Sequence, residues 1–257
     1  MTGLPPLRGL RVLNPRQASQ AGGLSRALAA AGAEVIELPL LAVEPLPLSP
    51  ESRACLLDLD RYQGTIFVSA NAARLGLDAV AGFWPQWPFR MPACAVGEAT
   101  RQVLAAAGLD AVSPAREDSE GLLDLPALQA VDGQRWLLFR GDGGRELLPG
   151  ALRARGARVD VLPLYRRMLP PGAEAQWLAL PAPPDAVLIT SVLVWRHWQR
   201  LAGAQASAPL LVAVSERVAG LLREAGAPRV LCATGAYPAA WVEALCHWRG
   251  AGAHGIQ

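Results

Sequence analysis

The sequence predicts an α/β protein made of two similar lobes, each built on a parallel sheet, and three observations favour this fold class. Short apolar runs typical of buried strands alternate with helical segments along the chain. A segment near the start recurs further along without a gap. The length of 257 residues fits one large or two small domains, and 52% hydrophobic residues are enough to fill their cores.

The recurring segment joins residues 9–41 to residues 133–165, at an offset of 124 residues. Further matches follow at offsets of 122 and 118 residues. The aligned pairs include Arg16 with Arg140, Gly32 with Gly156, Ser69 with Ser191, and Gly108 with Gly226. Chance similarity between alanine-rich helices is the alternative, but the ordered matches favour an internal duplication.

The predicted elements alternate in chain order. The predicted strands are Leu10–Leu13, Val35–Leu38, Thr65–Val68, Ala93–Val96, Trp136–Phe139, Val159–Leu162, Ala186–Ile189 and Leu210–Val214. The predicted helices are Leu24–Ala31, Asn71–Ala81, Glu98–Ala107, Leu147–Leu152, Val192–Leu201 and Glu216–Ala225. The first and fourth of these helices are expected to end at left-handed glycines, Gly32 and Gly156. Strands that alternate with helices imply parallel sheets covered on both faces, with ligands beyond the carboxyl ends of the strands.

The residues that follow the strands are therefore the candidates for ligand binding, and we expect the ligand in the cleft between the lobes. Small or hydroxyl residues precede several helices there, where free backbone N–H groups attract anions. The predicted binding residues are Arg16, Ser69, Ala70, Asn71, Gly97, Arg140, Gly141, Thr190, Ser191 and Ser215. The alternative for Ser69, Asn71, Thr190 and Ser215 is helix capping alone, and for the two arginines it is an ordinary surface position.

Tyr165 ends the second Leu-Pro-Leu element, where the first copy has Leu41. A tyrosine hydroxyl can donate a hydrogen bond or a proton, so Tyr165 is the candidate catalytic residue. The alternative is an aromatic residue that only packs in a linker.

Composition excludes several kinds of chemistry. All 24 basic residues are arginine, so a lysine Schiff base and a P-loop lysine are absent. The net charge of +2 and the scattered arginines predict no nucleic-acid partner. The four cysteines and three histidines are dispersed, which predicts no disulfide framework and no metal site. The sequence shows no signal peptide and no membrane span, so we expect a cytoplasmic protein.

Together, the strand-end motifs resemble those of the uroporphyrinogen-III synthase family. The landmarks are residues 14–16 (Asn-Pro-Arg), 67–72 (FVSANA), 95–100 (AVGEAT), 119–123 (SEGLL), 138–141 (LFRG), 144–145 (Gly-Arg) and 165–167 (Tyr-Arg-Arg). Periodicity alone suggests two halves, 1–131 and 132–257. The resemblance implies instead two flavodoxin-like lobes, one from 1–38 plus 168–257 and one from 45–161, joined by extended linkers at 38–45 and 162–167.

The resemblance also implies an activity. Family members close the linear tetrapyrrole hydroxymethylbilane to uroporphyrinogen III, with loss of water, inversion of ring D and no cofactor. Arg16, Arg140 and backbone N–H groups would hold substrate carboxylates, and Tyr165 would help the hydroxyl leave. The lobes would close on the substrate. We expect a monomer with no membrane contact, and a transient contact with hydroxymethylbilane synthase is left open.

The sequence departs from the family pattern at two positions. Val218 stands where the family has threonine, and Asn14 stands where it often has threonine. Two alternatives to a synthase stay open: a non-enzymatic two-lobed binding protein, whose duplicated lobes and cleft would be similar, and, because of Val218 and the lack of lysine, a degenerate synthase-like domain that acts as a sensor.

Overall fold

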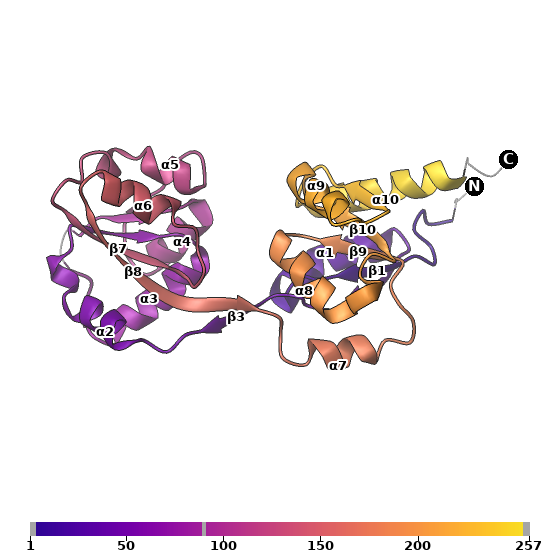
Figure 1. Ribbon diagram of the computed structural model, residues 1–257, viewed down its shortest axis with the longest axis horizontal. Coiled ribbons are helices and arrows are strands. Elements are labelled where there is room, and N and C mark those ends of the chain that lie inside the picture. Colours follow the sequence, from indigo (N-terminus) through magenta and orange to yellow (C-terminus); the bar gives the residue numbers. More distant parts are fainter. Residues whose placement is uncertain (1–3, 89–90, 254–257) are drawn as a thin grey trace. The chain divides into compact units, whose positions relative to one another are not determined.

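The structure is a computed structural model that describes residues 4–88 and 91–253, and it divides the chain into two compact units. Unit 1 contains the chain up to Ala42 and from Met168 onward, and unit 2 is Val43–Arg167. In both units a sheet of mainly parallel strands is covered by helices, so the predicted α/β fold class is confirmed (Figure 1). The division into halves that periodicity suggests is wrong, because unit 1 takes its strands from both ends of the chain.

Unit 1 contains a sheet of five strands whose neighbours are all parallel. In spatial order they are β11 (Val230–Cys232), β10 (Leu210–Ala213), β9 (Ala186–Ile189), β1 (Arg11–Asn14) and β2 (Glu34–Glu37). The helices are α1 (Ala18–Ala30), α7 (Ala173–Leu178), α8 (Val192–Ala202), α9 (Glu216–Glu224) and α10 (Pro238–Ala253). Alternate strand residues face opposite ways, so two cores form: one with α8 and α9, the other with α1 and α10.

Unit 2 contains a sheet of six strands. In spatial order they are β3 (Ala42–Pro45), β8 (Arg158–Met168), β7 (Arg135–Gly141), β4 (Gly64–Phe67), β5 (Ala93–Ala95) and β6 (Ala111–Val112). The helices are α2 (Pro50–Leu57), α3 (Ala70–Ala81), α4 (Glu98–Ala106), α5 (Ser119–Leu123) and α6 (Leu147–Ala154). One core packs against α2, α3 and α4, and the other packs against α5 and α6.

The two sheets share order and register, as the internal repeat predicts. Apart from β3, the order β2-β1-β9-β10-β11 in unit 1 corresponds to β8-β7-β4-β5-β6 in unit 2. Arg11 pairs with Glu34, and the residues 124 positions later, Arg135 and Arg158, pair in the same way. The backbone N–H of Arg11 donates to the Asp185 carboxylate at 2.8 Å, and that of Arg135 donates to the equivalent Gln63 side chain at 2.7 Å.

Glycines at equivalent positions also adopt the same conformation. Gly32 has φ +94° and Gly156 has φ +86°, and each follows the C-cap residue of its helix, α1 or α6, so both predicted left-handed helix ends are confirmed. An added Cβ at Gly32 would lie 2.5 Å from the Cβ of Pro5, and at Gly156 it would lie 2.0 Å from the Asp132 carboxylate. These positions therefore require glycine for both backbone conformation and space.

The stretches predicted as linkers are built into the units. Residues 162–167 form the second half of β8, and Leu162, Leu164 and Tyr165 are buried in a core of unit 2. Leu38 and Leu40 are buried in a core of unit 1. Beyond them, β3 lies beside β8. Apolar side chains at alternate positions explain why these stretches pack rather than run free.

Several elements are absent from the sequence prediction. They are β3, β6, β11, α2, α5, α7 and α10. Strands β6 and β11 have two and three residues, too few to show a periodic pattern, and Glu44 and Pro45 interrupt the apolar run of β3. Helix α10 did carry a signal, because Trp241, Leu245 and Trp248 have helical spacing.

Candidate functional site

The strongest candidate site lies at the carboxyl ends of β4, β7 and β8 in unit 2, where a β-bulge sets the direction of Tyr165. The pairing of β7 with β8 shifts between Arg140, opposite Pro163, and Gly141, opposite Tyr165. Leu164 is thereby the extra residue, and Leu164 and Tyr165 pack against the same core although they are consecutive. Without the bulge, alternation would direct Tyr165 to the opposite face of the sheet.

Gly141 makes room for the tyrosine ring. A Cβ at this position would lie 2.7 Å from Cε2 and 2.8 Å from Cζ of Tyr165. The carbonyl of Tyr165 accepts a hydrogen bond from the N–H of Asp142 at 2.7 Å, which holds the strand end in place. The residue is 1% exposed, so its ring is part of the core and its hydroxyl can act only through a neighbouring group.

The Tyr165 hydroxyl lies 2.9 Å from Oγ of Ser69. Ser69 is the N-cap of α3, and its Oγ accepts the N–H of Ala72 at 3.0 Å. The exposed guanidinium of Arg167 lies 3.5 Å from the same tyrosine hydroxyl. Three predicted residues, Ser69, Gly141 and Tyr165, thus meet at the start of one helix, where unpaired N–H groups favour an anion.

The other predicted residues of unit 2 have partners within the chain. Nη2 of Arg140 donates to Glu146 at 2.7 Å and Nη1 donates to the carbonyl of Arg145 at 3.1 Å, so this arginine is held by its own loop. Asn71 accepts a hydrogen bond from Arg74 and lies in the first turn of α3, where it is not an N-cap. Ala70 is the first residue of that helix.

The start of α4, which follows Gly97, already holds an anion. The carboxylate of Glu117 accepts the N–H of Glu98 at 3.0 Å. A Cβ on Gly97 would lie 2.5 Å from a Glu117 carboxylate oxygen, so glycine permits this approach. The predicted attraction of this helix start for anions is therefore visible, but the anion is a side chain of the protein, and sequence reasoning missed it.

In unit 1, the helix after β9 is capped by Ser191 and not by Thr190. Oγ of Ser191 accepts the N–H of Val194 at 3.2 Å, as Ser69 does for α3. The guanidinium of the partly buried Arg16 donates to the carbonyl of Ala236 at 2.6 Å. The backbone N–H of Arg16 donates to Oδ1 of Asn14 at 3.2 Å. Burial lowers the pKa of Arg16 from its usual value, yet an arginine stays protonated.

Ser215 lines a hollow of about 450 Å³ at the carboxyl ends of β10 and β11. Ser215 is the N-cap residue of α9, but its side chain makes no capping hydrogen bond. Thr234 and Gly235 also line it. The Thr234 hydroxyl lies 3.3 Å from the Tyr237 hydroxyl. Sequence reasoning missed Thr234 because β11 was not predicted, although a Thr-Gly pair four residues before Pro238 is a turn signal.

The two residues that depart from the family pattern, Val218 and Asn14, are both buried in unit 1. Val218 is 2% exposed and contributes to the core beneath α9. Asn14 is fully buried, and its side chain donates to Oγ of Ser25 at 3.0 Å while binding the Arg16 N–H. Asn14 therefore shapes the turn that carries Arg16.

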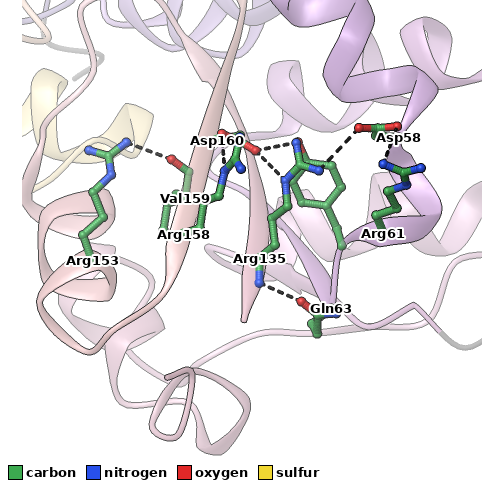
Figure 2. Close-up of polar contacts among 9 residues, drawn as sticks. Asp58, Arg61, Gln63, Arg135, Arg153, Arg158, Val159 and Asp160 are labelled. Carbon is green, nitrogen blue, oxygen red and sulfur yellow. Dashed lines mark hydrogen bonds and ion pairs between the residues drawn. The ribbon is translucent and has the colours of Figure 1, made fainter. Parts of the chain in front are cut away.

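A second polar cluster lies at the amino ends of the strands of unit 2, away from the candidate site. Figure 2 shows Asp160 between Arg135 and Arg158. The Tyr62 hydroxyl donates to Asp160 at 2.8 Å, and Nε of Arg135 donates to the same oxygen at 2.8 Å. Burial would raise the pKa of Asp160, but these hydrogen bonds and the positive charges outweigh it and lower that pKa. Burial, with Asp160 and Cys55 nearby, raises the pKa of Tyr62. The cluster joins β7 and β8 at their amino ends, so it is not part of the candidate site at the carboxyl ends.

Among the described residues, no three histidine, cysteine or acidic side chains gather as metal ligands. Within residues 4–88 and 91–253, no helix combines the length and apolar character needed to cross a bilayer.

Comparisons with known proteins agree on one family. The family model described as uroporphyrinogen-III synthase HemD matches residues 23–243. The uroporphyrinogen-III synthase of Synechococcus elongatus is 39% identical over 64% of this chain and 63% of its own length. That of Salmonella typhimurium is 38% identical over 54% of this chain and 61% of its own length. The alignments thus span less than two thirds of these relatives.

Solved structures show the same fold at lower identity. A uroporphyrinogen III synthase from Thermus thermophilus aligns with a TM-score of 0.62 at 20% identity, covering 91% of this chain and 97% of its own. The enzyme from Helicobacter pylori aligns with a TM-score of 0.61 at 15% identity, covering 92% and 97%. Since the family model covers most of the sequence, the chain belongs to the uroporphyrinogen-III synthase family.

Proposed function

We propose that this protein is a uroporphyrinogen-III synthase, which cyclises hydroxymethylbilane with inversion of ring D and loss of water. The observation that carries the proposal is the family match over residues 23–243. The strand-end residues agree with the chemistry, because a substrate with eight carboxylates needs hydrogen-bond donors and positive charge. The family match also favours an enzyme over a two-lobed binding protein or a sensor.

Ser69 is the group that we assign to the departing hydroxyl. A serine oxygen can accept two hydrogen bonds and donate one. If Tyr165 donates to Ser69, then Oγ of Ser69 accepts from both Tyr165 and the N–H of Ala72. Its own proton is then free to point outward, toward a hydroxyl that leaves as water, and the Tyr165 proton moves to Oγ of Ser69 as that proton is given up. Tyr165 is buried, so its catalytic effect acts through Ser69.

Substrate carboxylates would bind at two kinds of position. The start of α9, the Ser215 hydroxyl and Thr234 line one hollow, where N–H groups and hydroxyls can donate to an oxyanion. Exposed Arg167 supplies positive charge beside the Ser69–Tyr165 pair. Arg16 and Arg140 would first have to release their present partners, the carbonyl of Ala236 and the Glu146 carboxylate.

The reaction is mainly one of positioning, because hydroxymethylbilane also cyclises unaided to the wrong isomer. Holding reacting atoms in a productive geometry can supply much of the rate. We propose that no cofactor takes part, that the protein acts as a monomer in the cytoplasm, and that a contact with hydroxymethylbilane synthase, if formed, is transient.

An isomer assay tests the proposal. Hydroxymethylbilane is generated in place by its synthase, this protein is added with EDTA, and the oxidised products are separated by chromatography. We expect type III uroporphyrin to dominate. Type I alone, made in the presence of a protein that is folded by circular dichroism, would refute the proposal. Tetrapyrrole binding without a change of isomer would favour the sensor alternative.

A further inference from the structure

Unit 1 has a large cavity at the amino ends of its strands, opposite to the carboxyl ends where Ser215 lies. Its volume is about 1000 Å³, and Leu10, Asp185, Pro209 and Arg229, which directly precede β1, β9, β10 and β11, lie along it. We refer to it as the amino-end cavity. Strands of three or four residues separate it from the carboxyl-end residues, a span of about 10–13 Å. The cavity is therefore separate from the groups assigned to hydroxymethylbilane.

Three indole rings from three helices line this cavity: Trp177 of α7, Trp198 of α8 and Trp248 of α10. Trp177 and Trp198 meet edge to face, with ring centres 4.9 Å apart, and Nε1 of Trp198 donates to the carbonyl of Ala206 at 2.9 Å. Helices α7 and α10 lie on opposite sides of the sheet in Figure 1, so the indoles approach the sheet end from both sides. Trp177 and Trp248 are only partly buried and present apolar ring surface to the cavity.

The polar groups of the amino-end cavity have an excess of positive charge. Arg229 is fixed by donating to the carbonyl of Ala208, and Arg249 is exposed with its charge unpaired among the described residues. The Asp185 carboxylate already accepts the backbone N–H of Arg11 at 2.8 Å. Two arginines near aromatic walls suit an anion that is attached to an apolar ring system.

We propose that the amino-end cavity binds a flat, largely apolar molecule that carries a carboxylate or sulfonate at one edge. The ring system lies against Trp177 and Trp248, where burial of apolar surface and ring contacts supply affinity. The anionic group lies at the rim and accepts hydrogen bonds from Arg249 and Arg229. The volume matches that of pockets that bind small molecules.

The probe for this proposal is 8-anilinonaphthalene-1-sulfonate, which joins an apolar aromatic system to one sulfonate. Its emission rises when it leaves water, and a fall in energy transfer when one tryptophan is replaced reports that the probe lies near that indole. We expect saturable binding with one site per chain. Arg249→Glu should weaken binding by at least about tenfold, the effect of losing a charge-assisted hydrogen bond and adding repulsion.

Two further variants complete the test. Trp177→Ala, at a partly exposed ring, should lower the energy transfer and weaken binding, while circular dichroism stays that of the parent. Arg200→Glu on α8 makes the same charge reversal at an exposed residue outside the cavity and should leave the dissociation constant within about twofold.

Two results would overturn the proposal. One is binding that is absent, or equally strong in Arg249→Glu and Arg200→Glu, because the probe would then not lie in the cavity. The other is a parent protein that sediments as a dimer and an Arg249→Glu variant that sediments as a monomer, because this surface would then be an interface between two copies.

Discussion

Removing the Tyr165 hydroxyl tests the chemistry assigned to the start of α3. In Tyr165→Phe the ring keeps its place over Gly141, and the hydrogen bond to Ser69, 2.9 Å long, is lost. One such bond contributes about 0.5–1.5 kcal/mol to the free energy of unfolding, which corresponds to a fall in Tm of about 1–6 °C. The stability cost is therefore small.

The effect on the rate should be larger than the effect on stability. In Tyr165→Phe no hydroxyl replaces the proton that Ser69 gives up, so the leaving hydroxyl loses its acid. Loss of general-acid assistance costs about 10²–10⁴-fold at most. We expect slower formation of uroporphyrinogen III in the isomer assay, with the type III isomer still dominant because other groups position the substrate.

Tyr62→Phe is the matched control. It removes a hydroxyl that donates to Asp160 at 2.8 Å, at the amino end of the same sheet. We expect a comparable loss of stability with an unchanged rate. The reasoning is refuted if Tyr165→Phe forms product within about twofold of the parent rate, or if Tyr62→Phe is slowed equally.

Three other predictions concern stability and capping. Gly32→Ala should lower the free energy of unfolding in urea by about 1–3 kcal/mol, because φ is +94° and the new Cβ would lie 2.5 Å from Pro5. The lowered pKa of Asp160 means that its carboxylate stabilises the fold above about pH 4, and that this stabilisation is lost as pH falls through the lowered pKa. Asp160→Asn should thus be less stable at pH 7 and change less between about pH 5 and pH 2 in urea titrations. Ser69→Ala and Ser191→Ala each lose a cap worth about 0.5–2 kcal/mol, but only the first should also slow the isomer assay strongly.

The order of elements and the strand-end positions could be predicted from the sequence because apolar period and glycine punctuation are local signals. Strand β9 was predicted with its bounds, and the helix ends at Gly32 and Gly156 were predicted from residue type alone. The pairing of β1 with β9, 175 residues away in sequence, could not be predicted in this way, because no local signal specifies a distant partner.

The candidate site was predicted less completely, because the partners of a side chain depend on the tertiary structure. Arg140 occupies its predicted strand end, but Glu146 holds its guanidinium. Gly97 lies at a helix start as predicted, but Glu117 from a distant loop fills it. The approach of Tyr165 to Ser69 depends on a one-residue register shift that no pattern in the sequence marks.

The same register argument explains why the two units would differ in chemistry although their sheets correspond. Ser69 and Ser191 cap equivalent helices and accept equivalent N–H groups. The position that supplies a hydroxyl to Ser69 is Tyr165, and its counterpart 124 residues earlier is Leu41, which packs against a core of unit 1. A leucine offers no hydrogen bond, so Ser191 has no donor at that position to replace a proton that it gives up. Exchange of one side chain at a bulge is thus enough to confine proton donation to unit 2, and it leaves unit 1 with the hydroxyl and N–H groups that suit carboxylate binding.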